Sequence, residues 1–296
     1  MFELRHLRHF VAVAAELNFS RASEKLNIAQ PALSRSIQNL EVSLGVKVLK
    51  RTNRNVALTP AGISFLEDAE HILELASEAT RRANRASKGE VGELKIGYTD
   101  FAINGVLPSI IQDYCTQWPL VRISPIHGFS NIQLDALMER KLDIGFLNGP
   151  VLDPNLDFIE VQEDRFVVVL PKTHALAHRT SLKITELADE PFVLGDRNFW
   201  IPFHSTVVTL CRKNGFSPNI VQQVFNSEGV FGFVACGMGV TIHLESARNH
   251  LNSGVVIVPL EDIDETVKTN AVWPHDNNNP ASMHFVHCLE RFRENA

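Results

Sequence analysis

The stretch from residue 20 to residue 54 constrains the fold of this chain more than any other. If Pro31–Leu44 forms a helix, with about 100° between successive residues, two contrasting faces result. The face that can pack on a core consists of Leu33, Ile37, Leu40 and Leu44. The opposite face is small, polar and basic and consists of Pro31, Ser34, Arg35 and Gln38. Such donors and acceptors suit the edges of DNA bases.

A second, shorter helix is expected just before this one. Ser20–Leu26 has helical character, and Ser20 is a suitable N-cap. A tight turn around Asn27–Ala29 then joins the two helices into a helix-turn-helix.

Two short β-like runs follow Gly45 and predict a wing. They are Lys47–Lys50 and Asn55–Leu58, and two arginines lie in the turn between them. An ordinary helical packing unit would explain the apolar spacing, but not the outward polar face together with a basic wing. We therefore expect DNA contacts from Ser20, Gln30, Pro31, Ser34, Arg35, Gln38, Arg51 and Arg54.

Charge is distributed unevenly along the 296 residues. The chain has a net charge of −6, but residues 1–54 hold nine Lys/Arg against four Asp/Glu, a balance of +5. The remaining residues hold 19 against 30, a balance of −11. One basic module attached to an acidic body is the footprint of a nucleic-acid contact confined to one end.

A long helix is predicted after the wing. Thr59 is a good N-cap, Pro60 a good first helical residue, and Gly89 should stop the helix after about Lys88. A heptad seam follows from the spacing of Phe65, Ala69, Ile72, Ala76, Ala79, Ala83 and Ala86. A rod of about 43 Å with such a seam needs a partner helix, so we predict dimerisation through it. The alternative is that the seam packs on the chain's own body.

From Glu93 onward, strand and helix patterns alternate, which favours open α/β sheets. The expected strands are Leu94–Thr99, Val121–Ile126, Asp143–Leu147, Phe166–Leu170, Phe192–Gly195, Ile220–Phe225, Val240–His243 and Val255–Val258. The expected helices are Val106–Gln117, Asn131–Arg140, Ser205–Asn214, Ser227–Cys236 and Pro280–Phe292.

Residues 4–51, followed by the run L-T-P-A-G, resemble the winged helix-turn-helix of the LysR-type transcriptional regulators. The family often has Ser or Thr where Ala29 stands, so here Gln30 or a phosphate must cap the second helix instead. The resemblance extends more loosely through G-E-L-K-I-G-Y-T, L-D-A-L-M-E-R-K-L-D-I-G-F, V-V-V-L-P-K-T-H-A-L-A and V-A-C-G-M-G-V-T-I. The chain looks most similar to the aromatic-catabolism branch.

The resemblance implies an α/β multidomain protein. A winged helix-turn-helix at residues 1–58 is expected to be followed by a dimerising linker helix at 59–88 and a hinge at 89–92. Residues 93–296 would form a two-lobed effector-binding domain similar to periplasmic binding proteins. Lobe one would contain residues 93–163 and 269–296, and lobe two residues 164–268.

Polar residues at strand ends mark the expected effector cleft, because ligands bind there in open α/β sheets. Thr99 and Asp100 follow the first strand and Ser130 the second, although Ser130–Gln133 is also a capping box. The resemblance carries over Thr99, Asp100, Ser130 and Phe203 or His204, and adds Asn148, near which some members have Arg. Many members of the branch have a small hydroxyl residue near Asp100. An acidic residue there would repel a carboxylate ligand unless it is turned away or protonated.

Catalysis, cofactors and metals have little support. The pair His284/His287 with Cys288 offers three metal ligands without a fourth, and His174/His178 match a family loop. Gly237-Met238-Gly239 is too short for a dinucleotide fingerprint. The four scattered cysteines and the absence of a signal-like or membrane-spanning apolar run favour a cytoplasmic protein with reduced thiols.

The sequence therefore predicts a LysR-type regulator without enzymatic activity. It would bind an interrupted palindrome in double-stranded DNA as a homo-oligomer, a dimer of dimers, under the control of a small-molecule effector. The alternative is a cytoplasmic small-molecule-binding or enzyme-like α/β protein whose N-terminal helices only mediate assembly.

Overall fold

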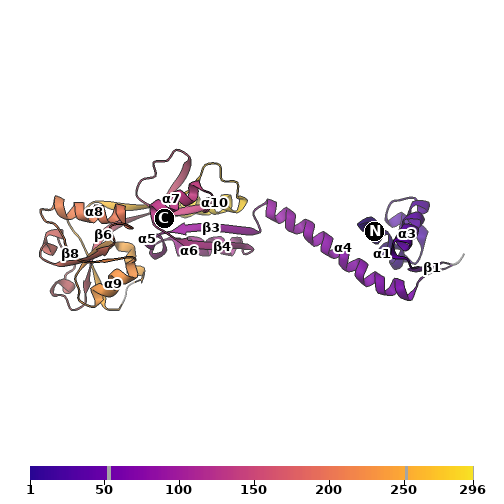
Figure 1. Ribbon diagram of the computed structural model, residues 1–296, viewed down its shortest axis with the longest axis horizontal. Coiled ribbons are helices and arrows are strands. Elements are labelled where there is room, and N and C mark those ends of the chain that lie inside the picture. Colours follow the sequence, from indigo (N-terminus) through magenta and orange to yellow (C-terminus); the bar gives the residue numbers. More distant parts are fainter. Residues whose placement is uncertain (52–54, 251–252, 296) are drawn as a thin grey trace. The chain divides into compact units, whose positions relative to one another are not determined.

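A computed structural model describes residues 1–51, 55–250 and 253–295. The chain divides into two compact units, Met1–Arg85 and Ala86–Ala296, and each unit is described by itself (Figure 1). No helix of the described residues is long and apolar enough to cross a membrane.

The first unit begins with three helices, α1 (Leu4–Glu16), α2 (Phe19–Lys25) and α3 (Gln30–Leu44). They enclose a core that contains Leu7, Phe10, Val13, Ala22, Leu33, Ile37, Leu40, Val48, Leu49 and Ala69. The apolar face predicted for the recognition helix is thus the buried one. Strands β1 (Leu49–Arg51) and β2 (Val56–Leu58) pair antiparallel as the predicted wing.

Helix α4 (Pro60–Ser87) follows, with the expected signals at both ends. The Thr59 hydroxyl accepts a hydrogen bond from the Gly62 amide at 2.9 Å. Gly62 must be glycine, because a Cβ atom there would lie 2.0 Å from the Val48 carbonyl oxygen. Beyond the helix, Gly89 adopts a φ of +69°, which favours glycine.

The seam of α4 divides into two parts. Phe65, Ala69 and Ile72 pack on the core of the first unit, and Phe65 lies 5.4 Å from Phe10 between ring centroids. Ala76 is half-buried, whereas Ala79 and Ala83 are exposed. The first half of the seam therefore packs within the first unit itself, and pairing of the second half with a partner helix remains a prediction.

The second unit is built on a seven-stranded sheet, whose strands run β10-β6-β11-β5-β3-β4, with β9 also paired to β6. Its strands are β3 (Gly92–Tyr98), β4 (Val121–His127), β5 (Ile144–Asn148), β6 (Leu156–Pro171), β9 (Thr241–Leu244), β10 (Val255–Pro259) and β11 (Thr266–Pro274). A separate parallel pair consists of β7 (Pro191–Gly195) and β8 (Asn219–Val224).

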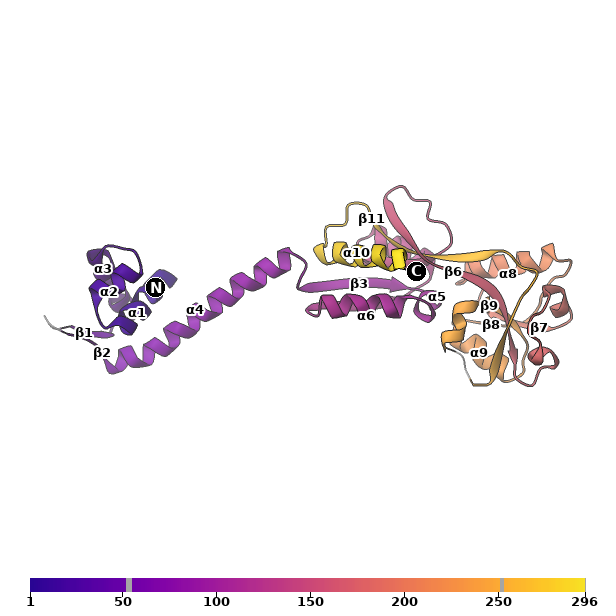
Figure 2. The same ribbon diagram turned by 180° about the vertical axis from the view of Figure 1, so that it is seen from behind.

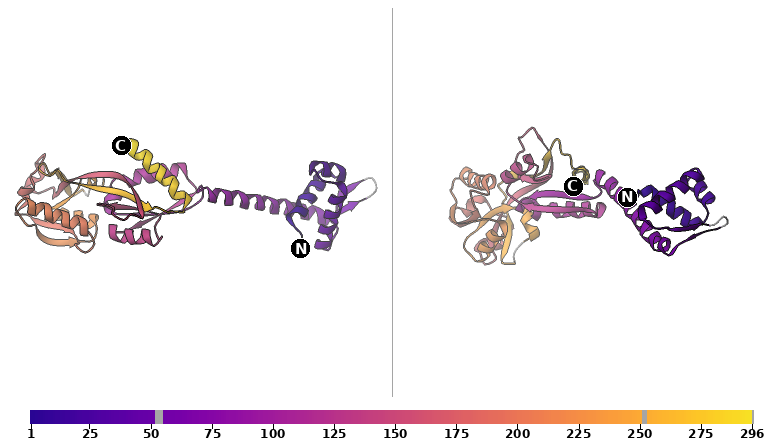
Figure 3. Two further views of the ribbon diagram at one scale, coloured as in Figure 1. Left: turned by 90° about the horizontal axis from the view of Figure 1, so that it is seen from above. Right: turned by 45° about the vertical axis from the view of Figure 1, so that its right-hand side comes forward.

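Strands β6 and β11 connect two lobes. From Leu156 to Arg165, β6 pairs with β11, and from Phe166 to Pro171 it pairs with β9 and β10. Figure 3 shows the two strands running side by side from one lobe into the other. The sequence predicted only the Phe166–Leu170 part of β6 and missed β11.

In lobe one, helices α6 (Leu107–Gln117) and α10 (Pro280–Asn295) pack beside β3 (Figure 2). The Tyr114 hydroxyl donates to the Ala281 carbonyl at 3.0 Å and joins the two helices. Helix α7 (Ser130–Met138) packs on a separate cluster that includes Leu137, Leu142 and Leu147. A short helix, α5 (Asp100–Asn104), was not predicted.

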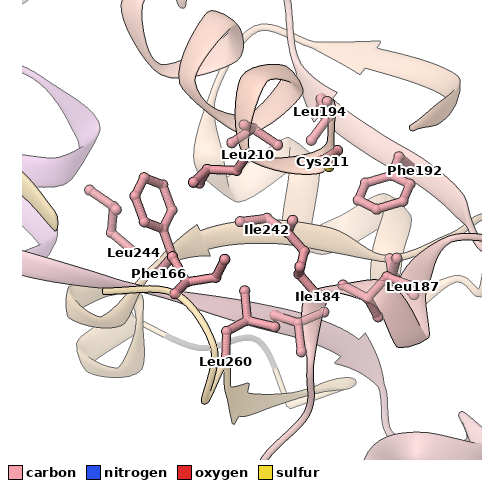
Figure 4. Close-up of a cluster of buried hydrophobic side chains, with 14 of the residues drawn as sticks. Phe166, Ile184, Leu187, Phe192, Leu194, Leu210, Cys211, Ile242, Leu244 and Leu260 are labelled. Atoms are coloured by element: carbon pink, nitrogen blue, oxygen red, sulfur yellow. The ribbon is translucent and has the colours of Figure 1, made fainter. Parts of the chain in front are cut away.

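Lobe two contains α8 (Ile201–Lys213), α9 (Ser227–Ala235) and three 3-10 helices, η1 (Ala175–His178), η2 (Ile184–Leu187) and η3 (Glu245–His250). Figure 4 shows part of its core, which contains Phe166, Ile184, Leu187, Phe192, Leu194, Leu210, Cys211, Ile242, Leu244 and Leu260. This core includes residues of β7 and α8, whereas α9 packs on a separate cluster with Val167 and Val169 of β6.

Candidate DNA-binding surface and effector cleft

The N-cap of α2 is Asn18 and not Ser20. The Asn18 side chain accepts hydrogen bonds from the amides of Ser20 at 2.9 Å and Arg21 at 3.1 Å. Because the helix begins at Phe19, Ser20 lies in its first turn with its side chain exposed. The predicted capping role of Ser20 is therefore wrong, and its predicted DNA contact remains a prediction.

The turn between α2 and α3 depends on Asn27, whose φ of +53° is one that Asn tolerates better than most residues. Helix α3 begins at Gln30, one residue earlier than predicted. Its N-cap is Ala29, which provides no side-chain hydrogen bond. The amides of the first turn of α3 thus lack the side-chain cap that the prediction assigned to Gln30, which leaves them suited to a phosphate.

The outward face of α3 is present as predicted. Gln30, Pro31, Arg35 and Gln38 are exposed and Ser34 is half-buried. Within the described part of the chain, the Arg35 guanidinium has no hydrogen-bond or ion-pair partner. A basic, exposed and unpaired side chain on the face opposite the core is the geometry that reading a base edge requires.

Glu41, which the sequence analysis did not single out, ties the wing to α3. Glu41 is 4% exposed, and its carboxylate accepts hydrogen bonds from the amides of Val48 at 3.1 Å and Leu49 at 3.2 Å. Lys47 Nζ lies 2.9 Å from the same carboxylate. The register between the recognition helix and the wing therefore depends on one buried side chain.

Arg51 belongs to strand β1 and not to the predicted turn. Its guanidinium donates to the Ser34 hydroxyl at 3.2 Å and lies 4.6 Å above the Phe19 ring. Arg51 thus holds the wing against α2 and α3. Arg54, the other predicted wing residue, lies outside the described residues.

In the second unit, four polar side chains from four elements form a network at the strand ends. The Thr99 hydroxyl donates to Asn148 Oδ1 at 2.8 Å, and Asn148 Nδ2 donates to the Thr269 hydroxyl at 2.8 Å. The Ser130 hydroxyl accepts a hydrogen bond from the Asn148 amide at 3.0 Å. The structure thus brings together three of the predicted effector residues.

Ser130 is the first residue of α7, and Phe129 is the N-cap. The capping-box alternative for Ser130 is therefore wrong, because its hydroxyl bonds to β5 and not to its own helix. Gln133, its expected partner in that box, is buried and donates to the carbonyl of Gly128 at 2.7 Å.

Asp100 bridges the two lobes. Its Oδ1 lies 2.8 Å from His127 Nε2 in lobe one, and its Oδ2 accepts from the Ser227 amide of lobe two at 2.6 Å. The Ser227 hydroxyl in turn lies 3.1 Å from His243 Nε2. The Asp100 carboxylate therefore lies at the N-terminus of α9, where the helix dipole favours negative charge.

A narrow cavity of about 40 Å³ lies between the lobes at this network. It is lined by Thr99, Asp100, Phe101, His127, Phe129, Ser130, Asn148, Phe199, Trp200, Pro202 and Phe203. Three larger hollows adjoin it, one of about 620 Å³ beside Ser227, one of about 470 Å³ beside Phe203 and one of about 320 Å³ beside Ile132. Apart from Phe203, this aromatic lining was not predicted, because the sequence pattern does not distinguish a phenylalanine that lines a cavity from one that packs in a core.

Of the two remaining predicted residues, Phe203 lines this cavity, whereas His204 bonds through Nδ1 to the Gly195 carbonyl at 3.0 Å and does not line it. His243 is fully buried among aromatic rings, and burial lowers its pKa to about 4. It is therefore neutral at physiological pH.

The weak metal candidate consists of residues that are engaged separately. His284 bonds to the Lys88 carbonyl at 2.7 Å, and His287 bonds to the Met283 carbonyl at 2.8 Å. Among the residues that the structure describes, no group of three His, Cys, Asp or Glu side chains could hold a metal ion.

Each of the two units matches a known protein family. Residues 4–63 match the bacterial regulatory helix-turn-helix of the lysR family, and residues 87–293 match the LysR substrate binding domain. This chain belongs to the LysR family of transcriptional regulators. The resemblance inferred from the motifs is confirmed, together with an N-terminal helix-turn-helix, the long helix α4 and a C-terminal α/β substrate-binding domain.

Relatives of this LysR regulator align along nearly its whole length. It is 36% identical to the HTH-type transcriptional regulator AlsR of Bacillus subtilis, over 96% of this chain and 94% of AlsR. It is 35% identical to the Hca operon transcriptional activator HcaR of Escherichia coli, over 97% of each chain. Among solved structures, full-length CbnR complexed with its target DNA has a TM-score of 0.85 and 25% identity, covering 98% of this chain and 99% of CbnR.

These matches decide between the two hypotheses that the sequence left open. The N-terminal helices are those of a DNA-binding regulator and not only an assembly module. The family is one of transcriptional regulators and not of enzymes.

Proposed function

We propose that this regulator reads an interrupted palindromic DNA site through α3. The observation that supports this proposal most is the position of Arg35. Its side chain is exposed, has no partner among the described residues and lies on the face opposite the buried leucines. Gln30, Pro31, Ser34 and Gln38 complete that face. Ser20, Arg51 and Arg54 would contact the phosphate backbone beside it, which positions the helix without specifying sequence.

A small cytoplasmic metabolite is proposed to bind between the lobes. Thr99, Ser130 and Asn148 already form one network there, and Phe203 supplies an apolar wall. A cavity of about 40 Å³ is too small for a drug-sized ligand, whose sites measure about 300–1,000 Å³. A ligand of that size would therefore extend from this cavity into the adjoining hollows.

The domain boundaries follow from the same arrangement. We propose residues 1–58 as the DNA-binding domain, 59–88 as the linker, 89–92 as the hinge and 93–296 as the effector-binding domain. The crossing between lobes would lie near residues 163 and 269, where the pairing of β6 and β11 shifts register.

Assembly is proposed to occur through the exposed half of α4. Ala76, Ala79 and Ala83 leave room for a second helix to approach closely, whereas Phe65, Ala69 and Ile72 support the first unit. A two-fold pair would present two α3 helices to a palindrome, and two such pairs would form a dimer of dimers. An effector could then alter the spacing of the recognition helices without any chemistry.

The direct test of DNA reading is a gel-shift titration on the chain's own upstream DNA. Arg35→Ala should cost about 1–3 kcal/mol in specific binding, because a bidentate contact to a base would be lost. Arg293→Ala, in the second unit, is the matched control for loss of a positive charge. Equal affinities for both variants, with folded proteins, would remove α3 from the proposed role.

A further inference from the structure

The part of the proposed cleft beside Ser227 is bordered by negatively charged side chains and, in the ranges that the structure describes, by no positively charged one. Asp100 and Glu228 border the hollow of about 620 Å³. Neither Lys nor Arg occurs among the described residues that line this hollow, the cleft or the hollow of about 320 Å³. The hollow of about 470 Å³ on the other side of the cleft contains Lys268, whose Nζ is paired with Glu160 at 2.8 Å. Glu228 is exposed and has no ion-pair partner in the described part of the chain. An anion added in the hollow beside Ser227 would meet two carboxylates and no fixed positive side chain.

The position that would best attract an anion is already filled by the chain itself. The N-terminus of a helix favours a carboxylate, and at α9 that carboxylate is Asp100, 2.6 Å from the Ser227 amide. The Gly229 amide in the same first turn donates to the Asn226 side chain at 2.9 Å. A ligand carboxylate would have to displace Asp100 or lie beside its like charge.

Aromatic rings from both lobes form the other wall. Phe129 of lobe one lies 5.3 Å from Phe199 and 5.1 Å from Phe225 of lobe two, and these two rings are 5.1 Å apart. Phe199 and Phe225 are exposed. His127 connects this triad to Asp100, because its ring lies 5.9 Å from Phe129 while its Nε2 bonds to the carboxylate. The faces of such rings attract cations.

We propose that the effector of this regulator is a small organic cation, an aromatic or aliphatic amine. Its ammonium group pairs with Asp100 and Glu228, and its apolar body lies on Phe129, Phe199 and Phe225. Asp100 can accept this further bond, since each carboxylate oxygen has two lone pairs and uses one of them here, Oδ1 toward His127 and Oδ2 toward the Ser227 amide. The inference rests on the proposed effector cleft and specifies the ligand class that this cleft prefers.

Calorimetric titration of the full-length protein tests the ligand class with three probes that differ in charge. They are 2-phenylethylamine, phenylacetate and 2-phenylethanol, which share a phenyl ring and a short chain. We expect the amine to bind most tightly. Asp100→Asn and Glu228→Gln should weaken amine binding, with the double variant at least about tenfold weaker, equivalent to about 1.4 kcal/mol. Binding of the alcohol should be unchanged.

Glu290→Gln is the matched control, because Glu290 is an exposed carboxylate of α10 that lines none of the three spaces. The proposal is overturned if phenylacetate binds at least as tightly as the amine, or if millimolar amine gives no binding. It is also overturned if the double variant binds the amine like Glu290→Gln. A footprint on upstream DNA, run in parallel, separates this outcome from failure of the regulator function.

Discussion

Replacing Glu41 with Ala should destabilise the DNA-binding unit more than any other single carboxylate change in it. The substitution leaves the buried amides of Val48 and Leu49 without their acceptor. Each unpaired amide costs about 1–3 kcal/mol, so we expect the free energy of unfolding of this unit to fall by about 3 kcal/mol. At about 4–8 °C per kcal/mol for a unit of this size, its melting temperature should fall by on the order of 10–20 °C. Glu41→Gln keeps one acceptor oxygen and should cost less.

The sequence itself offers a way to separate the two units in this assay. All three tryptophans, Trp118, Trp200 and Trp273, belong to the second unit. In Glu41→Ala, the unfolding transition followed by tryptophan fluorescence, which reports the second unit, should therefore stay at the wild-type temperature. Far-UV circular dichroism should show an earlier loss of helix from the first unit. Glu24→Ala removes an exposed carboxylate of α2 and is the control. If Glu41→Ala and Glu24→Ala give superposable dichroism curves, Glu41 does not hold the wing.

Three further predictions follow from the second unit and the linker. Burial lowers the pKa of His243 to about 4 in the folded protein, whereas in the unfolded chain this imidazole binds a proton below its ordinary pKa of 6.5. Stability should therefore be complete above pH 6.5 and fall by about 1.4 kcal/mol per pH unit toward pH 4, and His243→Phe should flatten this dependence in fluorescence melts. Ser130→Ala should cost about 1 kcal/mol by removing the acceptor of the Asn148 amide, whereas Ser130→Thr should retain it, as thermal denaturation would reveal. Ala79→Glu should weaken self-association in sedimentation experiments. Ser77→Glu, which adds the same charge beside the seam and one turn before Arg81 on the same face, should not. Equal sedimentation of the two would exclude the seam.

The sequence was sufficient to predict the elements whose signals are local. The two faces of α3 follow from apolar spacing alone, and Thr59 with Pro60 marks the start of α4 by capping chemistry. Ser20 failed as a cap because the side chain of Asn18, two residues earlier, accepts hydrogen bonds from the amides of Ser20 and Arg21. Glu41 could have been found, since it lies one helical turn after Ile37 on the buried face, where a lone carboxylate requires partners.

The site between the lobes depends on contacts that spacing cannot reveal. Asp100 and Ser227 are 127 positions apart in the sequence and meet only because β6 and β11 cross between lobes. Those strands were underestimated because Leu156–Arg165 interleaves charges with its apolar residues, and β11 ends in a proline. Ser130 illustrates the opposite error, where a local capping pattern was present but the hydroxyl bonds to a neighbouring strand.

A footprint of the protein on its own upstream DNA tests the central claim most directly. With α3 as the reading element, we expect protection of two related half-sites in opposite orientation. Protection should persist in the presence of excess DNA of the same composition and shuffled sequence. It should be lost in Arg35→Ala but retained in Arg293→Ala. Uniform protection that shuffled DNA removes equally well, or a footprint unaffected by Arg35→Ala, would contradict sequence reading by this helix.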